Sequence, residues 1–521
     1  MKDIFTKSEN FKQEYSATIV KVGELKDIEN SDNLKQAVID GFSVVVNKND
    51  VHDGDYMVYC KNETELNADF LSVNNMFEIG ERQLNANFGE VEQLLSEGRN
   101  DEAKAKVGYF NKHGRVKMIK LRGCPSMGVL IRLENLVKWD KKLQEVVLAD
   151  YVTYDENGNF IPFDFDTING KLFIQAYIPR TNPTRSGARK GDKRDRTKQF
   201  DRMVPGEWAF HYDTNQLNSN IWMLKPSDIV DISVKVHGTS IVIGNVLVKK
   251  PVALDGVKKW LNKKTDKKLK ALQKKRVNLY QVSKMASEIE KLKGKRFKNY
   301  SIGHGNVYSS RTVIKNQYIN TKVTSGFYDM DIWGEYNELL KGKIPEDVTI
   351  YGEIVGYLTG VERMIQKNYD YGCARGTNKL MIYRVAEKQV DGTHREYEIA
   401  EVIRFAEKLM MDYPELTTRM MPYTLLYHGT LAALYPNIST TNHWNENVLE
   451  AMKIDKEHFG MEQNEPLCKN KVPREGICLR IANDPVKECF KLKCSSFLIK
   501  ESAEIDKGNV DMEMADNYSG M

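Results

Sequence analysis

Apolar and polar positions in the first 170 residues form short runs that are separated by turn residues. The runs are rich in β-branched and aromatic side chains, which favours strands at residues 18–22, 43–46 and 56–59, and again at 115–121 and 128–133. Residues 90–107 have the spacing of a helix. Several short strands with one helix predict a small closed barrel of the OB type, and an ordinary β-sandwich is the alternative that the pattern leaves open.

A second group of strands is predicted around Lys235. The apolar residues 229–234 precede this lysine, and the apolar residues 241–243 follow it. Near the end of the chain, Lys491 and Lys493 lie two apart in a β-like run, so they share one face of a strand. An edge strand with two lysines in solvent is the alternative explanation.

Polar segments suggest where the chain divides. Residues 185–202 are rich in glycine and charge with almost nothing apolar, which indicates a flexible basic linker. Helical spacing is expected in an insert at about residues 250–300 and again over residues 397–459. We therefore predict an N-terminal module at residues 1–175, a linker at 176–203, a second domain at 204–500 and a short, loose tail at 501–521.

The insert in the second domain is strongly basic. Between Lys249 and Lys298 there are 18 Lys or Arg residues and 4 Asp or Glu residues, although the whole chain carries a net charge of only +5. A local excess of this kind favours a polyanionic partner such as nucleic acid. A solvated helix face is the alternative.

Composition limits the class of protein. Of the 521 residues, 41% are hydrophobic and 10% aromatic, which is enough for two or three packed domains and excludes a disordered chain. No apolar run approaches the length of a membrane span, and the first residues have no apolar signal core. The seven cysteines include no Cys-x-x-Cys pair, which argues against zinc and favours a reducing compartment. We expect a cytoplasmic protein with no membrane contact.

The candidate chemistry begins at Lys235, within the sequence Lys-Val-His-Gly-Thr-Ser. A lysine that attacks phosphorus must be neutral, whereas its ordinary pKa is about 10.4. Burial and nearby positive charge lower the pKa of a lysine. If Lys491 and Lys493 face Lys235, they would destabilise its ammonium form and also neutralise a phosphate under attack. Taken alone, Lys235 could equally be a lysine on a surface strand.

Two glutamates follow Lys235 along the chain, each beside a glycine that would let backbone approach a ligand. They are Glu353, in Tyr-Gly-Glu, and Glu475, in Arg-Glu-Gly. Such carboxylates would bind a ribose hydroxyl or a divalent metal, and magnesium requires only one or two of them. A strand-end glutamate in water is the alternative for each one. The chain contains no Gly-x-x-x-x-Gly-Lys-Ser/Thr sequence, which excludes a P-loop enzyme.

In this order, the motifs resemble those of the covalent nucleotidyltransferase superfamily of polynucleotide ligases and mRNA capping enzymes. The chain looks most like the RNA ligase 2 branch, which has histidine at the position of His237. The resemblance extends over about residues 210–500 and includes residues 308–311 and 365–372. Residues 120–128 and 211–214 are similar to parts of a nick-sealing bacterial and viral class of RNA ligases, in which an OB-like module precedes the ligase domain.

The resemblance implies an α+β fold. We expect an N-terminal OB-like β-barrel module and a nucleotidyltransferase (ATP-grasp-like ligase) domain of antiparallel sheets with flanking helices. The implied activity is that of an ATP-dependent RNA ligase, which joins 3′-hydroxyl and 5′-phosphate ends through lysyl-AMP and an adenylylated end.

Residue roles also follow from the resemblance. Lys235 would be the nucleophile, and His237, Lys491 and Lys493 would be catalytic with it. The same three lysines would bind the nucleotide together with Gly238, Arg311, Glu353, Tyr383 and Glu475. Glu475 would hold Mg²⁺ or Mn²⁺ through water.

The implied partners are ATP and nucleic acid: RNA ends, a nicked duplex or an RNA–DNA hybrid, in RNA repair. The expected protein is a monomer in the cytoplasm, or in the host cytoplasm if its origin is viral or phage. Two positions depart from the family pattern, since Arg384 follows Tyr383 where an acid is usual, and Ser240 replaces an asparagine. Tyr383 would stack on the nucleoside, and the alternative is that it is an ordinary aromatic residue of the core. The remaining alternatives are a GTP-using capping nucleotidyltransferase and a non-catalytic nucleic-acid-binding protein that keeps the ligase fold.

Overall fold

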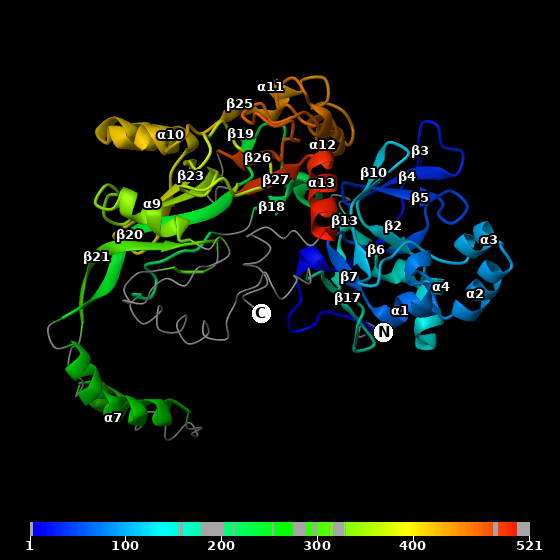
Figure 1. Cartoon of the computed structure of the whole chain (residues 1–521), viewed down its shortest axis with the longest axis horizontal. Coiled ribbons are helices and arrows are strands. Elements are labelled where there is room, and N and C mark those ends of the chain that lie inside the picture. Colours follow the sequence, from blue (N-terminus) through cyan, green and yellow to red (C-terminus); the bar gives the residue numbers. More distant parts are fainter. Residues whose placement is uncertain are drawn as a thin grey trace.

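The computed structural model describes residues 4–154, 156, 160–178, 203–211, 214–252, 255–274, 288–294, 300–311, 313–315, 328, 330–482 and 488–507. We call residues 4–178 the N-terminal module and residues 203–507 the C-terminal domain. Figure 1 shows the two parts side by side, with the final helix, α13 (Ser495–Asp506), between them. The predicted linker at residues 185–202 lies outside the described residues.

The N-terminal module is built from small antiparallel sheets. One has four strands in the order β11 (Val129–Ile131), β6 (Tyr56–Cys60), β2 (Ala17–Lys21) and β14 (Phe163–Phe165). Beside it is a meander of β3 (Lys26–Asp27), β4 (Leu34–Ile39) and β5 (Phe42–Asn47). The remaining strands form short sheets: β17 (Ile174–Ala176), β7 (Thr64–Leu66) and β8 (Arg115–Val116); β1 (Phe5–Thr6), β15 (Thr167–Ile168) and β16 (Lys171–Leu172); β9 (Ile119–Leu121) and β10 (Cys124–Ser126); and β12 (Thr153–Tyr154) and β13 (Phe160–Ile161).

Short helices connect these strands. They are η1 (Gln13–Tyr15), α1 (Ala68–Val73), η2 (Ile79–Leu84), α2 (Phe88–Ser96), α3 (Asn100–Ala105), α4 (Leu133–Trp139), η3 (Lys141–Leu143) and η4 (Leu148–Tyr151). The strands predicted at residues 18–22, 43–46 and 56–59 and the helical segment at 90–107 are confirmed. The expectation of only one helix is wrong, because α1 and α4 also pack their apolar residues into the core of the module.

The C-terminal domain contains two five-stranded sheets. The first has the order β18 (Asn215–Gln216), β27 (Cys489–Lys493), β26 (Gly476–Ile481), β19 (Ile229–Lys235) and β25 (Leu425–Thr430), and only the pair of β18 and β27 is parallel. The second is antiparallel, in the order β21 (Tyr300–Ser309), β20 (Thr239–Pro251), β22 (Val348–Gly356), β23 (Asn378–Lys388) and β24 (His394–Glu396). Since β19 leads directly into β20, the segment around Lys235 joins the two sheets.

Helices flank both sheets, so the predicted α+β class with antiparallel sheets is confirmed. Apolar residues of α9 (Ile332–Leu340), α10 (Ile399–Asp412) and η7 (Pro414–Thr418) form one core with strands β20, β22 and β23. A second core joins the sheet of β19 to α6 (Leu217–Asn220), η6 (Ile221–Met223), α11 (Leu431–Leu434), α12 (Trp444–Ile454) and α13. None of the described helices is long and apolar enough to cross a membrane.

Two boundaries differ from the sequence-based expectation. The segment at residues 397–459 is not helical throughout, because β25 interrupts it and pairs with the central strand β19. The predicted tail does not start at residue 501, because α13 continues to Asp506 and buries Ser502 and Ile505.

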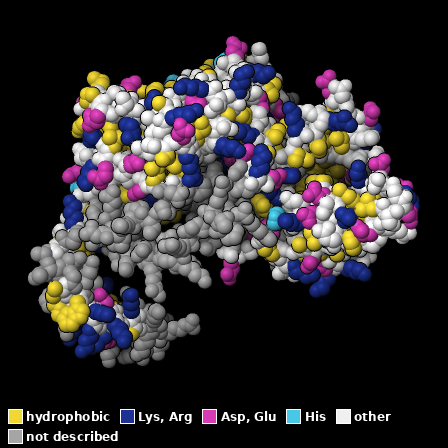
Figure 2. Space-filling model, viewed as in Figure 1, with side chains coloured by type: hydrophobic (Ala, Val, Ile, Leu, Met, Phe, Trp, Pro, Cys, Tyr) yellow, Lys and Arg dark blue, Asp and Glu magenta, His cyan; other side chains and the backbone are white. Residues whose placement is uncertain are grey.

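The lysine-rich insert forms α7 (Asp255–Lys274), and residues 288–294 are also helical. Helix α7 projects away from the C-terminal domain (Figure 1), and Lys and Arg side chains gather on its visible face (Figure 2). The expected helical spacing is confirmed for these residues.

Candidate active site

Strand register brings Lys235 close to Lys493. Lys235 ends β19 and lies opposite Gly476 of β26, and Gly476 lies opposite Lys493 of β27. The middle position must be glycine, because φ is +149° there and a Cβ atom would lie 2.1 Å from the carbonyl oxygen of Leu492. The two lysines therefore flank a strand position that has no side chain.

Glu475 fills the space between the two lysines. Its Oε1 lies 2.9 Å from the Nζ of Lys235 and 3.3 Å from the Nζ of Lys493, and its side chain is only 3% exposed. A buried carboxylate needs charged or hydrogen-bonding partners, and two ammonium groups supply them. The arrangement around Lys235 is thus a mixed cluster of lysines and one acid.

One pocket collects most of the predicted residues. Its lining includes six of them: Lys235, Arg311, Glu353, Tyr383, Lys491 and Lys493. We call Lys235, Arg311, Lys491 and Lys493 the cationic corner. The expectation that Lys491 and Lys493 share a face is confirmed, because both side chains line this pocket.

Burial disfavours the charged form of Lys491. It lowers the pKa of this ammonium group, and the neighbouring charges of Lys493, Arg311 and Lys235 lower it further. Glu14 of the N-terminal module acts in the opposite direction. A concentration of positive charge of this kind binds phosphate groups.

Glu353 is held at the turn that follows Lys235. The backbone N–H of Gly238 donates to Oε1 of Glu353 over 3.1 Å. A Cβ atom at position 238 would lie 2.3 Å from the carbonyl oxygen of Ile354, so only glycine allows this approach. The predicted Gly238 and Glu353 therefore meet, and the carboxylate stands at the pocket wall.

His237, like Gly238 and Glu475, lies outside the lining of this pocket. Its ring packs edge-on against Tyr369 and Phe497, with centroids 4.9 Å away in both cases. Its Nδ1 lies 3.7 Å from Oε2 of Glu475. Burial lowers the pKa of His237 despite this carboxylate, which favours a neutral imidazole. His237 thus lies beside Glu475.

Tyr383 and Arg384 lie at the other end of the pocket. The ring of Tyr383 is 5.7 Å from that of His211, and both line the pocket. Arg384, which stands where an acid was expected, pairs with Glu396 over 2.6 Å and lies over the ring of Tyr351. An arginine is tolerated here because Glu396, on the neighbouring strand β24, compensates its charge.

No group of three or more His, Cys, Asp or Glu residues that could hold a metal ion occurs within the described ranges. Glu475 contacts two lysines of the cationic corner, and Glu353 lines the same pocket as these lysines. One or two carboxylates suit magnesium when phosphate oxygens and water complete its coordination. The residues present therefore fit a water-mediated metal contact at Glu475, which stays a prediction.

The sequence reasoning missed several residues that shape this region. Glu14 and Tyr15 of η1 approach the cationic corner from the N-terminal module, and Glu501 of α13 lies 3.5 Å from the Nζ of Lys493. No local motif marks them. Only the packing of the two parts of the chain reveals their position.

Comparisons with known proteins give two findings. A family model described as an OB-fold domain matches residues 16–91, which confirms the expected type of N-terminal module. No protein of curated function matches the sequence.

Among solved structures, the chain is similar to Naegleria gruberi RNA ligase. The ligase with PPi is 14% identical, with 95% of this chain and 100% of that chain covered and a TM-score of 0.45. Two substitution variants, one with ATP and Mn and one with AMP and Mn, are each 14% identical, with 93% of this chain and 98% of that chain covered and TM-scores of 0.45 and 0.46.

Proposed function

We propose that this protein is an ATP-dependent RNA ligase of the covalent nucleotidyltransferase superfamily that joins 3′-hydroxyl and 5′-phosphate ends. The observation that carries the proposal is the row formed by Lys235, Gly476 and Lys493 across three neighbouring strands, in a pocket with Lys491 and Arg311. A nucleophilic lysine beside three further cations suits nucleotidyl transfer, because each transfer step builds negative charge on phosphate oxygens.

The first reaction would charge Lys235. Its neutral Nζ attacks the α-phosphorus of ATP, a P–N bond forms, the bond to the bridging oxygen of pyrophosphate breaks, and a proton leaves the nitrogen. Lys491, Lys493 and Arg311 would stabilise the charge that develops on the phosphates. Glu475, in contact with Lys235, would hold its Nζ in position.

The nucleoside would occupy the rest of the pocket. Glu353 lines this pocket and would accept a hydrogen bond from a ribose hydroxyl, and Tyr383 with His211 would supply aromatic surface for a base. Magnesium or manganese, held through water by Glu475, would further neutralise the phosphates. The neutral, buried His237 would keep Glu475 oriented.

In the second and third reactions, AMP would pass from Lys235 to a 5′-phosphate, and a 3′-hydroxyl would then displace AMP to form the phosphodiester bond. The OB-fold module supports a nucleic-acid substrate, since this fold commonly binds single strands. The exposed lysines of α7 would add affinity for the phosphate backbone that is independent of sequence.

The test is covalent labelling. Purified protein, first treated with pyrophosphate to remove bound AMP, is incubated with Mg²⁺ and α-labelled ATP and analysed on a denaturing gel, beside Lys235→Ala. We expect label on the wild type and none on the variant. Equal label on both proteins would exclude Lys235 as the nucleophile, and an unlabelled wild type would favour a binding protein that only keeps the fold. Competition with unlabelled GTP separates the ligase from a capping enzyme.

A further inference from the structure

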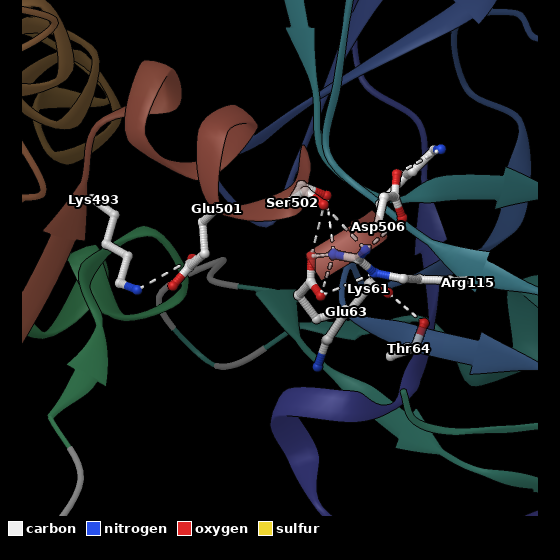
Figure 3. Close-up of polar contacts among 9 residues, drawn as sticks. Lys61, Glu63, Thr64, Arg115, Lys493, Glu501, Ser502 and Asp506 are labelled. Atoms are coloured by element: carbon white, nitrogen blue, oxygen red, sulfur yellow. Dashed lines mark hydrogen bonds and ion pairs between the residues drawn. The ribbon is translucent and has the colours of Figure 1, made fainter. Parts of the chain in front are cut away.

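Charged side chains of the two parts of the chain are paired where the parts meet. We call this contact the docking face and define it by Asp40 and Arg115 of the N-terminal module with their partners in the C-terminal domain. The guanidinium group of Arg115 is fully buried, and it lies 2.8 Å from Glu63 and 2.7 Å from Asp506 (Figure 3). Ser219 donates a hydrogen bond to Asp40 over 2.5 Å. Two carboxylates already neutralise the arginine, so it is not available to an anionic ligand.

Helix α7, by contrast, presents its lysines to solvent. Lys263, Lys264, Lys267, Lys268 and Lys270 are all exposed. Within the ranges that the structure describes, none of these five lysines forms an ion pair. Exposed ammonium groups at this density attract a polyanion, because binding releases the counterions that condense on it. Helix α7 therefore offers a cationic surface that the docking face lacks.

The first half of α7 also exposes apolar side chains. Val257, Trp260 and Leu261 are 52%, 71% and 45% exposed, respectively. The same helix has a packed side, on which Asn262 and Leu269 are buried. The helix thus buries an asparagine and leaves a tryptophan in water. An exposed apolar group with basic neighbours marks a surface for a partner.

The tryptophan and the lysines form one surface. Residues three, four and seven apart lie on the same face of a helix, so Trp260 shares its face with Lys263, Lys264 and Lys267. We call these four residues the α7 stripe. Figure 2 shows apolar and basic side chains together on the visible face of this helix. Seven helical steps are about 10 Å long, which is the length of about three stacked nucleotides.

A single-stranded polynucleotide fits the chemistry of the α7 stripe. Its phosphates pair with ammonium groups, and each unpaired base offers a face on which an indole ring stacks. The bases of a duplex stack on one another, so a duplex would use the lysines and not Trp260. A lipid surface suits the stripe less well, because a helix that lies in a membrane keeps its charges off its apolar face.

Two long strands connect α7 to the candidate active site (Figure 1). Strand β20 starts at Thr239, four residues after Lys235, and leads to α7; β21 returns and ends at Ser309, two residues before Arg311. The strands are paired over ten positions. Since β20 has 13 residues, the two-stranded arm is roughly 40 Å long at about 3.3 Å per residue. That length corresponds to about 12 stacked nucleotides.

We propose that the α7 stripe binds a single-stranded segment of the polynucleotide, with Trp260 stacked on an unpaired base and Lys263, Lys264 and Lys267 paired with the neighbouring phosphates. The proposal deepens the proposed function, on which it rests for the polynucleotide substrate. The stripe is a remote clamp that holds the strand up to roughly 40 Å from the cationic corner and does not read its sequence.

The experiment measures how tightly the full chain binds a labelled single-stranded RNA by fluorescence anisotropy. An RNA of about 16 nucleotides is long enough to reach from α7 to the corner. Trp260→Leu keeps an apolar side chain and removes the indole, and we expect Kd to rise at least about fivefold. Trp260→Phe should restore most of the affinity, because it restores an aromatic ring. Unchanged binding by Trp260→Leu overturns the proposal.

Two controls separate stacking from other effects. Leu261→Ala removes an exposed apolar side chain next to the stripe and should leave the affinity unchanged; a loss equal to that of Trp260→Leu would indicate an apolar contact and overturn the stacking. With a duplex of the same sequence, Trp260→Leu should bind like the wild type. An equal loss on duplex and single strand would also overturn the stacking.

The part played by the lysines is tested with salt. The triple variant Lys263→Ala/Lys264→Ala/Lys267→Ala should bind both forms of RNA more weakly, and the slope of log K against log salt concentration should become shallower by about 2. An unchanged slope would remove these lysines from the proposal. Trp260→Leu should leave the slope as it is, because it removes no charge.

Vesicles of phosphatidylserine and phosphatidylcholine test the other partner of a basic surface with a tryptophan. We expect the wild type not to sediment with these vesicles at the salt concentration of the RNA experiment. Sedimentation that is lost in Trp260→Ala would assign the α7 stripe to a lipid surface and overturn the proposal.

RNA binding does not require that Lys235 carries AMP, so the two proposals fail separately. Weaker binding of single-stranded RNA by Trp260→Leu, in a protein that cannot be labelled with ATP, would support the clamp and refute the ligase. Labelling of Lys235 together with unchanged RNA binding by Trp260→Leu would support the ligase and refute the clamp.

Discussion

The cationic corner and the docking face of the N-terminal module are both built from charged residues, but they are assembled differently. At the corner, Lys235, Gly476 and Lys493 meet through the register of neighbouring strands, and each is part of a short sequence motif. At the docking face, Arg115 meets Asp506 across 391 positions, and neither residue is part of a motif. The residues of the corner can be predicted from sequence motifs on paired strands. The docking contacts depend on how the two folded parts of the chain pack together.

The largest effect on the cationic corner is predicted for Gly476→Ala, because this substitution disturbs the pairing of the strands that carry Lys235 and Lys493. The new methyl group would overlap the carbonyl of Leu492, and φ of +149° is unfavourable for alanine. We expect a loss of about 3 kcal/mol or more in the free energy of unfolding, together with loss of labelling by ATP. Thermal denaturation measures the stability, and Gly98→Ala is the control, because it changes a glycine with positive φ in open space. Equal effects of the two substitutions would contradict the packing argument.

A smaller effect is predicted for Lys493→Ala, which leaves the register intact and removes one cation from the corner. Loss of one preorganised charge should slow the charging of Lys235 by about 10²–10³-fold. Single-turnover labelling with α-labelled ATP measures the rate. Lys507→Ala, an exposed lysine beyond α13, is the control. A rate within twofold of the wild type would remove Lys493 from the proposed mechanism.

The smallest effect is predicted for Asp40→Asn at the docking face, where the substitution should change how stability depends on pH. Burial raises the pKa of Asp40 to about 6, against the hydrogen bond from Ser219, from an ordinary value of 3.8. Because the folded pKa is raised, the protonated carboxyl stabilises docking below pH 4, and this contribution is lost as the pH rises through 6. Asp40→Asn imitates the protonated form, so its stability relative to the wild type should increase between pH 4 and pH 7 by on the order of 1–3 kcal/mol.

Thermal melts of both proteins across this pH range measure the difference. The comparison of variant with wild type cancels the contributions of the other titrating groups, because these groups are the same in both proteins. A constant difference in melting temperature from pH 4 to pH 7 would show that Asp40 does not titrate at the docked interface.

Much of the fold was predictable because it depends on local patterns. The strands around residues 18–22, 56–59 and 229–234 were visible as short β-rich runs, and α7 as a helical spacing of lysines. The strand β25 was missed because its residues lie among helical ones, and only its pairing with β19 makes it a strand. The end of α13 was missed because its acidic residues are typical of a solvated tail. In the folded protein Arg115 pairs with Asp506 and the helix continues to this residue.

The sequence by itself determined which residue types are available for the proposed chemistry: a lysine between two strands, two glycine-flanked glutamates, and a pair of lysines on one strand face. Alternation along a strand and the order of motifs carry this information, since both act over a few residues. The tertiary structure alone decided how these groups are paired. It placed Glu475 between Lys235 and Lys493, packed His237 against Tyr369 and Phe497, and brought Glu14 to Lys491. Charges interact through space, so their partners are set by packing between segments that are far apart in the chain.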